Sequence, residues 1–568
     1  MATVTRAGRV LLKEKGAFYT PPAMARALVD WAVRTAHDSV LDPSCGDGEF
    51  LVQAIRRLRE LGASQTQALD HVLGVDSDPN AARLAAERLE TEGGSARCPR
   101  VTPADFFSCR PDSRAYASRL DPEVLPTVDV VVGNPPYIRY HGFQGPTRAS
   151  AASAVAHAGI RLTDLTSSWA PFVVHATSFL KPSGRLAFVL PGELLSVDYA
   201  KSIRDFLGVA FKSVTITAFD ERVFPGVLAD TLFVLADKSG LSEGLALNRY
   251  RNLSDLPSDS SYLSAGERLQ FSQSGRKWSD LVLDPEARSA YRRCSSFDGV
   301  GRLGDRFSVD IGIVSGNNDV FLLTQEQLER IGIPPTEVLP ILSSSGHILG
   351  THVSAREFDA IRASGQRCWL LNFAGKSNLS SEAKAYLASV PLKGGRERYK
   401  IRSRRKWYEV PSVYAPTAFM SYFISEAPRF ALNEIGATST NTIHRLRNLS
   451  AESDSPSAVL LSCYSSLTML SSEVEGRSYG GGVGKLETKE AENLRVVIPT
   501  PDAAKELGAR ESEMHSALRC HNQSEAVRLV DEVLLLGQLG LSEALLRSLR
   551  SGLETLRSRR KSRMRGAS

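Results

Sequence analysis

Residues 128–137 have the sequence VDVVVGNPPY, a run of branched apolar residues that stops at a glycine and two prolines. The three valines at 130–132 are apolar at successive positions, as expected for a strand buried on both faces of a parallel sheet. Proline fixes its own φ angle and has no N–H to donate, so Pro135 and Pro136 end the strand. The stretch therefore predicts a central strand followed by a rigid turn.

Similar apolar runs lie on both sides of this strand, and amphipathic helical stretches such as 49–62 and 79–93 separate most of them. Strand–helix alternation builds a doubly wound parallel sheet. The last two runs have no full helix between them, which predicts an antiparallel hairpin at the end. The fold class is therefore α/β, with a seven-stranded, mostly parallel Rossmann-like sheet. The six further runs are 39–43, 71–78, 98–107, 184–192, 213–220 and 230–237.

The pattern changes after about residue 240, so we expect several units. Residues 252–280 are rich in Ser, Asp and Gly, and dense turn signals follow residue 290. The expected domains are a catalytic domain at 1–245, a linker at 246–290, a mixed α/β domain at 291–500 and a helical segment with a basic tail at 501–568.

Composition indicates an ordinary globular protein. The chain has 568 residues, 42% of them hydrophobic, and a net charge of +6, which is compatible with a nucleic-acid partner without proving one. We expect no membrane segment and a cytoplasmic location, because neither a membrane-length apolar run nor a signal-peptide core is present. The seven cysteines include no CxxC pair, which argues against disulfides and a zinc site, so no metal is expected.

Polar residues follow three successive strands. The first strand ends in LDPSCGDGEF at 41–50, whose glycines allow close backbone approach to a nucleoside. Asp76 ends the second strand and suits ribose hydroxyls; Asp105 can accept the adenine amino group while Phe106 covers the ring. Neither a dinucleotide fingerprint nor a Walker loop is completed, which favours S-adenosyl-L-methionine (AdoMet) over NAD or ATP. The predicted contacts are Asp42, Pro43, Cys45, Gly46, Gly48, Asp76, Asp105, Phe106 and Asn134.

The turn at 134–137, Asn-Pro-Pro-Tyr, lies where open α/β sheets bind ligands. The lone pair of adenine's amino nitrogen is delocalised into the ring, so the nitrogen is a poor nucleophile until both N–H groups are bound. The Asn134 side-chain oxygen and the Pro135 carbonyl can accept them, Pro136 helps to fix the backbone, and Tyr137 offers a stacking face. The residues predicted to carry catalysis are therefore Asn134, Pro135, Pro136 and Tyr137. A base paired in duplex DNA must first be flipped out.

At this point the sequence resembles the gamma-class adenine-N6 DNA methyltransferases of type II-like restriction–modification systems, which are AdoMet-dependent enzymes of the class I fold. The segment GAFYTPP at 16–22 matches the family's N-terminal cofactor motif and implies Tyr19 and Thr20 as AdoMet contacts. The segment 220–225 implies that Phe224 stacks on the flipped adenine opposite Tyr137. Asp42 replaces a Glu of some members, keeping the charge but shortening the reach. The resemblance implies a target-recognition domain at 291–500, duplex DNA as partner, a separately encoded restriction endonuclease and a monomeric enzyme.

A basic tract with interleaved aromatics suggests a DNA contact. Its predicted DNA-binding residues are Lys400, Arg402, Arg404, Arg405, Lys406 and Trp407. The alternative is a solvated helix face. Residues 439–445 and 476–482 could also approach DNA or serve as ordinary turns, and the basic tail at 557–565 is expected to be a frayed, solubilising end.

Three other functions fit part of the pattern. The same loop suits N4-cytosine methylation or methylation of a protein glutamine, although the latter needs no large basic second domain. A non-catalytic DNA-binding subunit is expected to lose Asn134 or Asp76, and both are present. The cofactor motif begins within the first 20 residues, so we expect no N-terminal nuclease, and cleavage would fall to a separate protein.

Overall fold

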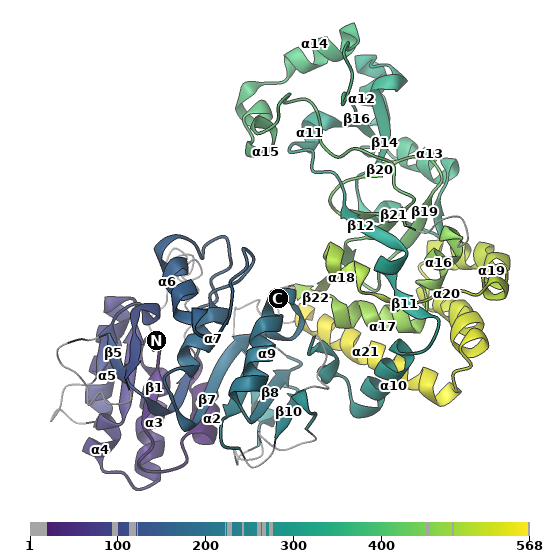
Figure 1. Cartoon of the computed structure of the whole chain (residues 1–568). Helices are drawn as coiled ribbons and strands as arrows, with labels where there is room; N and C mark the ends of the chain where they lie inside the picture. Colours follow the sequence, from purple (N-terminus) through teal and green to yellow (C-terminus); the bar gives the residue numbers. More distant parts are fainter. Residues whose placement is uncertain are drawn as a thin grey trace. The chain divides into compact units, whose positions relative to one another are not determined.

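The structure is a computed structural model of the full chain (Figure 1). It describes residues 20–93, 100–112, 121, 123–221, 223, 230–240, 243–257, 259, 263, 268–271, 277–449, 455–479 and 482–565. The chain divides into two compact units, residues 1–282 with 562–568 and residues 283–561, and each is described by itself.

The first unit is built on a mostly parallel sheet with eight strands among its described residues. All seven predicted strands are present, and the predicted hairpin is confirmed because β8 pairs antiparallel with β9. The eighth strand, β10, pairs parallel with β8. In sheet order the strands are β10 (Gly244–Tyr250), β8 (Ser213–Phe219), β9 (Thr231–Asp237), β7 (Leu180–Pro191), β6 (Val128–Gly133), β1 (Val40–Asp42), β2 (Val72–Asp76) and β3 (Val101–Pro103).

Helices cover this sheet by burying one face each, as amphipathic patterning dictates. In α3, for example, Leu51, Ile55 and Leu58 are fully buried and join Val72 and Val130 in one core cluster. The helices are α2 (Pro22–Ala32), α3 (Glu49–Glu60), α4 (Gln65–Asp70), α5 (Pro79–Gly93), α6 (Gly145–Ala156), α7 (Trp169–Thr177), α8 (Glu193–Ser196) and α9 (Lys201–Ala210). The unit also contains a short 3-10 turn, η1 (Phe106–Ser108), and a two-stranded pair, β4 (Arg110–Asp112) and β5 (Val124–Pro126).

The second unit is mixed α/β, as predicted. Its five-stranded sheet has the order β12 (Phe307–Ile311), β21 (Ile443–Asn448), β17 (Ala418–Ser421), β19 (Phe430–Asn433) and β15 (His352–Val353). A four-stranded sheet contains β13 (Leu322–Leu323), β16 (Trp369–Leu371), β14 (Val338–Leu342) and β20 (Thr438–Ser439). The smaller sheets pair β18 (Phe423–Ile424), β23 (Val483–Lys485) and β22 (Arg477–Tyr479), and β11 (Val300–Arg302) with β24 (Arg495–Val497).

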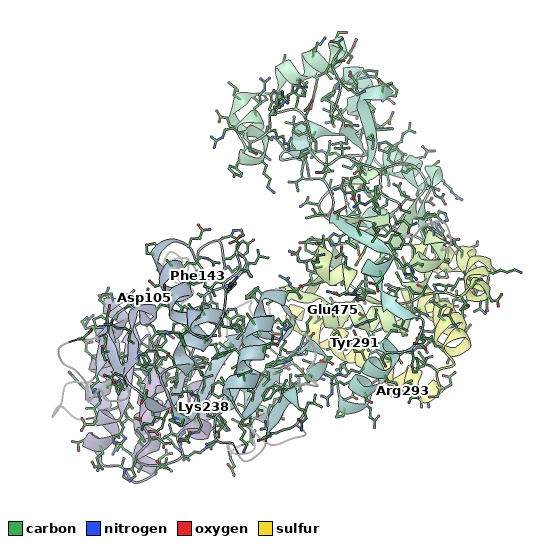
Figure 2. All side chains as sticks on the ribbon, viewed as in Figure 1. Asp105, Phe143, Lys238, Tyr291, Arg293 and Glu475 are labelled. Carbon is green, nitrogen blue, oxygen red and sulfur yellow. The ribbon has the colours of Figure 1, made fainter. Side chains whose placement is uncertain are left out.

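The helices of this unit gather at its two ends (Figure 1). One end holds α11 (Asn318–Phe321), α12 (Gln325–Ile331), α14 (Ser381–Ser389) and α15 (Tyr399–Arg402). The other holds α16 (Pro456–Ser462), α17 (Ser466–Glu475), α19 (Pro501–Arg519), α20 (Gln523–Val530) and most of α21 (Glu543–Arg565). The remaining helices are α10 (Pro285–Ser295), α13 (Ala355–Ala363) and α18 (Thr488–Glu492). Tyr291 on α10 hydrogen-bonds Ser471 on α17 (3.3 Å), and Figure 2 labels this tyrosine.

The domain boundaries differ from the predicted ones. Residues 244–250, most of which fall in the predicted linker 246–290, form β10 and extend the sheet. The predicted linker also includes the start of α10, which belongs to the second unit together with most of the predicted separate segment 501–568. The Ser-rich composition of residues 252–280 predicted irregular backbone. It did not predict the residue at which the core of the first unit ends and that of the second begins.

One further prediction is wrong. The basic tail is not a frayed end: Arg560 on α21 is 5% exposed, pairs with Glu473 (2.7 Å) and donates to the carbonyls of Ser425 (3.0 Å) and Gly482 (2.7 Å). Most of the stretch 439–445 is buried around β20 and β21, where Ser439, Thr440, His444 and Arg445 are at most 3% exposed. Asn441 is exposed in the turn between the two strands, and its approach to DNA stays a prediction.

Candidate active site

The sheet brings the predicted site residues to one edge. Strands β6, β1, β2 and β3 are neighbours and run parallel, so their carboxyl ends lie side by side. Asp42 ends β1 and Asp76 ends β2. Asn134 follows the last residue of β6, and Asp105 lies two residues beyond β3. Parallel topology therefore assembles polar groups that lie almost a hundred residues apart in the chain.

The turn between β1 and α3 has an open backbone. Gly46 and Gly48 adopt φ angles of +55° and +85°, which other residues rarely take. A Cβ on Gly46 would meet nothing within 4 Å, so a ligand can approach the main chain there. Asp76 supports the turn, because its Oδ2 accepts the Gly46 N–H at 2.8 Å and its Oδ1 accepts the Asp78 N–H at 2.8 Å.

Asp42 lies beside the turn at 134–137 and is almost completely buried. It is 1% exposed, its Oδ1 accepts the Ser44 N–H (3.1 Å), and its Oδ2 has no hydrogen-bond partner among the described residues. Burial raises the pKa of Asp42 well above its usual range. A Cβ at Gly133, where φ is +154°, would lie 2.8 Å from Asp42 Oδ1, so only glycine lets the two strand ends approach this closely.

Asp105, labelled in Figure 2, caps η1 by accepting the Phe107 N–H at 3.0 Å. The next residue, Phe106, is 3% exposed and packs against Phe172, His175 and Phe179, with ring centroids 4.7–5.0 Å apart. The structure thus places Phe106 mainly in the aromatic core below the site. Its contact with the cofactor ring stays a prediction.

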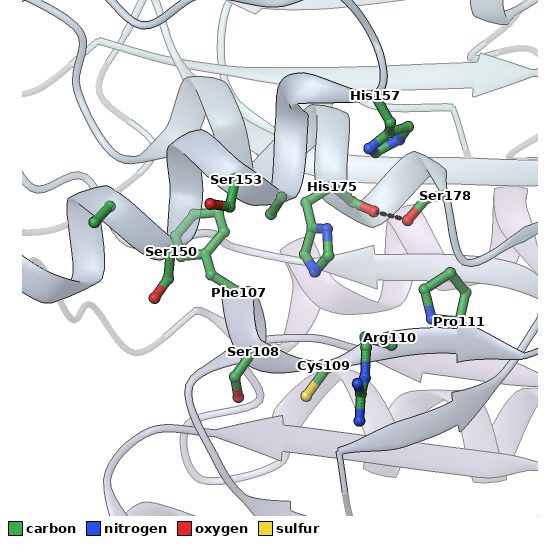
Figure 3. A pocket seen from close by; sticks show the side chains of 12 residues that line it. Phe107, Ser108, Cys109, Arg110, Pro111, Ser150, Ser153, His157, His175 and Ser178 are labelled. Carbon is green, nitrogen blue, oxygen red and sulfur yellow. Dashed lines mark hydrogen bonds between the residues drawn. The ribbon is translucent and has the colours of Figure 1, made fainter.

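A pocket borders the 3-10 turn η1 (Figure 3). It is lined by residues of η1, β4, α6 and α7, among them Phe107, Arg110 and Ser153. His175 reaches it from α7 and forms a 3.0 Å hydrogen bond with the Phe106 carbonyl through Nε2. Burial lowers the pKa of His175 to about 4, so this imidazole is neutral at physiological pH.

Asn134 is held by the N-terminal segment that carries the predicted cofactor motif. Its Nδ2 donates to Thr20 Oγ1 at 3.2 Å. The oxygen and the NH₂ group leave the amide carbon in different directions, so this bond turns the Asn134 oxygen away from Thr20. The oxygen is then directed to accept a hydrogen bond from another group. Tyr19 and Phe224, predicted as a cofactor contact and a stacking face, lie outside the described residues.

The turn after Asn134 is fixed from two sides. The Tyr137 hydroxyl donates to the Val189 carbonyl on β7 (2.9 Å). Ser168 Oγ donates to the Pro136 carbonyl and accepts the Ile138 N–H (2.9 Å). Sequence reasoning missed Ser168, which lies thirty residues downstream in a stretch, SSWAPF, that reads only as the start of an apolar helix. A serine next to a helix start is ordinarily a cap, so no sequence signal identified it.

The predicted DNA-binding tract separates into an inner and an outer set. Arg404 donates to the carbonyls of Ser315 (2.7 Å) and Val314 (3.2 Å), and burial lowers its pKa. Trp407 is half-buried and lies under the guanidinium of Arg396 (4.6 Å). Both side chains thus make contacts within the domain, and their assignment as DNA contacts stays a prediction. Lys400, Arg402, Arg405 and Lys406 are exposed, and Lys406 pairs with Glu409 (2.9 Å).

The strand order, with one antiparallel strand inserted between β7 and β8, and the polar strand ends define a class I methyltransferase fold. Two family models match the chain: the N-6 DNA methylase over residues 4–242, and the C-terminal domain of the type II methyltransferase M.Eco57I over residues 275–535. The chain belongs to the adenine-N6 DNA methyltransferases of restriction–modification systems, in the gamma class, where the catalytic part precedes the recognition part.

Individual relatives agree with this placement. The type II methyltransferase M.XamI of Xanthomonas campestris pv. amaranthicola is 24% identical over 499 residues, which cover 85% of each chain. M.AccI of Acinetobacter calcoaceticus is 20% identical over 369 residues, 64% of this chain and 67% of that relative. The type IIL restriction–modification enzyme MmeI, solved in complex with DNA, shares the fold with a TM-score of 0.55 at 13% identity, covering 95% of this chain and 75% of that one.

Proposed function

We propose that this DNA methyltransferase acts through two hydrogen-bond acceptors at the tip of β6, the Asn134 side-chain oxygen and the Pro135 carbonyl. They would receive the two N–H groups of a flipped-out adenine and turn its nitrogen lone pair toward the methyl donor. Asn134 positions the base and takes no proton, because its amide does not titrate. Most of the acceleration then comes from alignment. The observation that carries this proposal is the Thr20 bond, which orients the Asn134 amide.

The strand ends suit AdoMet as the methyl donor. Asp76 would hold the ribose hydroxyls, Asp105 the adenine amino group, and the open backbone at Gly46 the adjoining part of the molecule. Asp42 Oδ2, buried and without a partner among the described residues, is an acceptor for the ammonium group at the amino-acid end. When bound, AdoMet supplies an electrophilic methyl group carried on a sulfonium.

The four outward basic residues, Lys400, Arg402, Arg405 and Lys406, would contact phosphates of duplex DNA. Tyr137, with Phe224 opposite it, would stack on the everted base. We further propose that the chain acts as a monomer and that a separately encoded restriction endonuclease carries out cleavage. Among the described residues every helix is too short or too polar to cross a bilayer.

Sequencing DNA from a host that expresses the chain, with modification-sensitive reads, tests this function. We expect N6-methyladenine at one position of a single short recognition sequence. N4-methylcytosine at that site would instead support the cytosine alternative, and unmodified DNA from cells containing folded protein would contradict the proposal.

A further inference from the structure

We propose that Ser168 is a positioning residue for methyl transfer, which holds the catalytic turn 134–138 so that the Tyr137 ring meets the target base in one orientation. The inference rests on the proposed function of that turn. It concerns a residue outside the catalytic motif, on the segment that leads into α7.

Ser168 is hydrogen-bonded to the turn on both sides of Tyr137. Its Oγ donates to the carbonyl of Pro136, the residue before Tyr137, and accepts the N–H of Ile138, the residue after it (2.9 Å). In addition, the Ser168 N–H donates to the Ile138 carbonyl (3.0 Å). Three hydrogen bonds therefore join one residue to the main chain that flanks the proposed stacking ring.

The far end of Tyr137 is also held. Its hydroxyl donates to the Val189 carbonyl at 2.9 Å, near the carboxyl end of β7. The ring is thus tied through its hydroxyl to the sheet and through its backbone to Ser168. Such a ring has little freedom to rotate about its first side-chain torsion.

Ser168 is itself immobilised by a buried polar network. It is 1% exposed and lies between Ser167 and Trp169, which are 5% and 0% exposed. The Tyr199 hydroxyl accepts from Trp169 Nε1 (3.2 Å), shares a 3.1 Å hydrogen bond with Ser167 Oγ and donates to Glu193 Oε2 (2.6 Å). Burial raises the pKa of Tyr199, so its hydroxyl keeps the proton that it donates. Both neighbours of Ser168 are therefore anchored to the segment 193–199.

Removing the Ser168 hydroxyl would leave the Pro136 carbonyl and the Ile138 N–H without this partner, and the turn would relax. Misplacement of a reacting group by about 1 Å costs on the order of 10²-fold in rate. The proposed AdoMet contacts Asp42, Asp76 and Asp105 lie at other strand ends, so AdoMet binding should survive.

The test compares Ser168→Ala with Ser178→Ala in the full chain. Ser178 lies at the other end of α7, where its hydroxyl donates to the His175 carbonyl (2.6 Å) and does not touch the turn. We expect Ser168→Ala to lower kcat by between about 10- and 100-fold, with the dissociation constant for AdoMet and the melting temperature matching those of Ser178→Ala. Tyr199→Phe keeps the ring but removes the hydroxyl, and it should lower kcat less, in the same direction.

Equal turnover of Ser168→Ala and Ser178→Ala would overturn the inference, and so would a loss explained by weaker AdoMet binding or lower thermal stability. Should Ser168→Ala fail to fold, unchanged kcat in folded Tyr199→Phe would overturn it. A wild-type chain that transfers no methyl group to adenine would refute the proposed function instead, which keeps the two failures distinct.

Discussion

The amide of Asn134 has no proton to exchange near neutral pH, so the contribution to methyl transfer that we propose for it is geometric. The structure accounts for the geometry through Thr20, which receives the amide N–H and thereby orients the oxygen. Two residues that are 114 positions apart in the sequence thus orient one amide. The motif at 134–137 predicted the acceptor, and the resemblance implied Thr20 only as a cofactor contact; its bond to Asn134 became visible once both were placed in the fold.

His175 gives a residue-scale prediction on pH dependence. Its folded-state pKa of about 4 lies below the usual 6.5. As the pH falls below 6.5, His175 therefore takes up a proton in the unfolded chain but not in the folded chain. Stability is therefore complete above pH 6.5 and decreases toward pH 4. Between pH 7 and pH 5 the loss should be about 2 kcal/mol, at about 1.4 kcal/mol for each pH unit below 6.5.

Urea denaturation at pH 7 and pH 5 checks this. His175→Gln should show a pH dependence shallower by about 2 kcal/mol than the wild type. Ser178→Ala, which alters a bond to the same residue without removing a titrating group, should keep the wild-type dependence. Parallel curves for wild type and His175→Gln would disprove the burial argument.

At the scale of elements, the start of α3 depends on a glycine. Gly48 caps the helix at φ +85°, and a Cβ there would lie 3.1 Å from the Ala85 Cβ on α5. Gly48→Ala should therefore cost about 1–3 kcal/mol of stability through backbone strain and crowding, and it should weaken AdoMet binding. Gly62→Ala is the control. Gly62 has a φ of +106°, and an added Cβ would have nothing within 4 Å, so this substitution strains the backbone beyond the end of the same helix without crowding a neighbour.

Thermal melting and AdoMet titration of the two variants provide the measurement. Gly62→Ala should lose some stability yet bind AdoMet like the wild type. If Gly62→Ala reduced AdoMet affinity as much as Gly48→Ala, the turn between β1 and α3 would have no special part in binding.

The basic tract yields another element-scale prediction. Arg405 is exposed whereas Arg404 binds main-chain carbonyls, so the two neighbours should respond differently to neutralisation. Arg405→Gln should reduce the salt slope of DNA binding by about one and leave stability unchanged. Arg404→Gln should lower the melting temperature. DNA-binding isotherms at several salt concentrations, together with melting curves, test both; an unchanged slope for Arg405→Gln would move the phosphate contact elsewhere.

The tract also shows where prediction from sequence stops. Strand periodicity predicted the sheet and its site edge because parallel strands must align their carboxyl ends. It could not separate Arg404 from Arg405, because which guanidinium turns inward depends on carbonyls ninety residues away, at Val314 and Ser315. The same limit concealed Ser168 and the buried Arg560, whose partners are distant in sequence.

At the scale of the whole molecule, the residues proposed for catalysis and those proposed for DNA binding belong to different units. The first carries the strand-end site, and the second carries the outward basic residues that we assign to DNA. The family models match the chain in the same order, catalytic part first. If these assignments hold, chemistry and recognition are built on separate cores, and variants in one set of side chains should leave the other function measurable.

The most direct test of the central claim is nucleoside analysis of DNA incubated with labelled AdoMet and either wild type or Asn134→Ala. We expect N6-methyldeoxyadenosine with the wild type and none with Asn134→Ala, although the variant still binds AdoMet. Near-normal methylation of adenine by Asn134→Ala would contradict the claim that this amide oxygen activates the base.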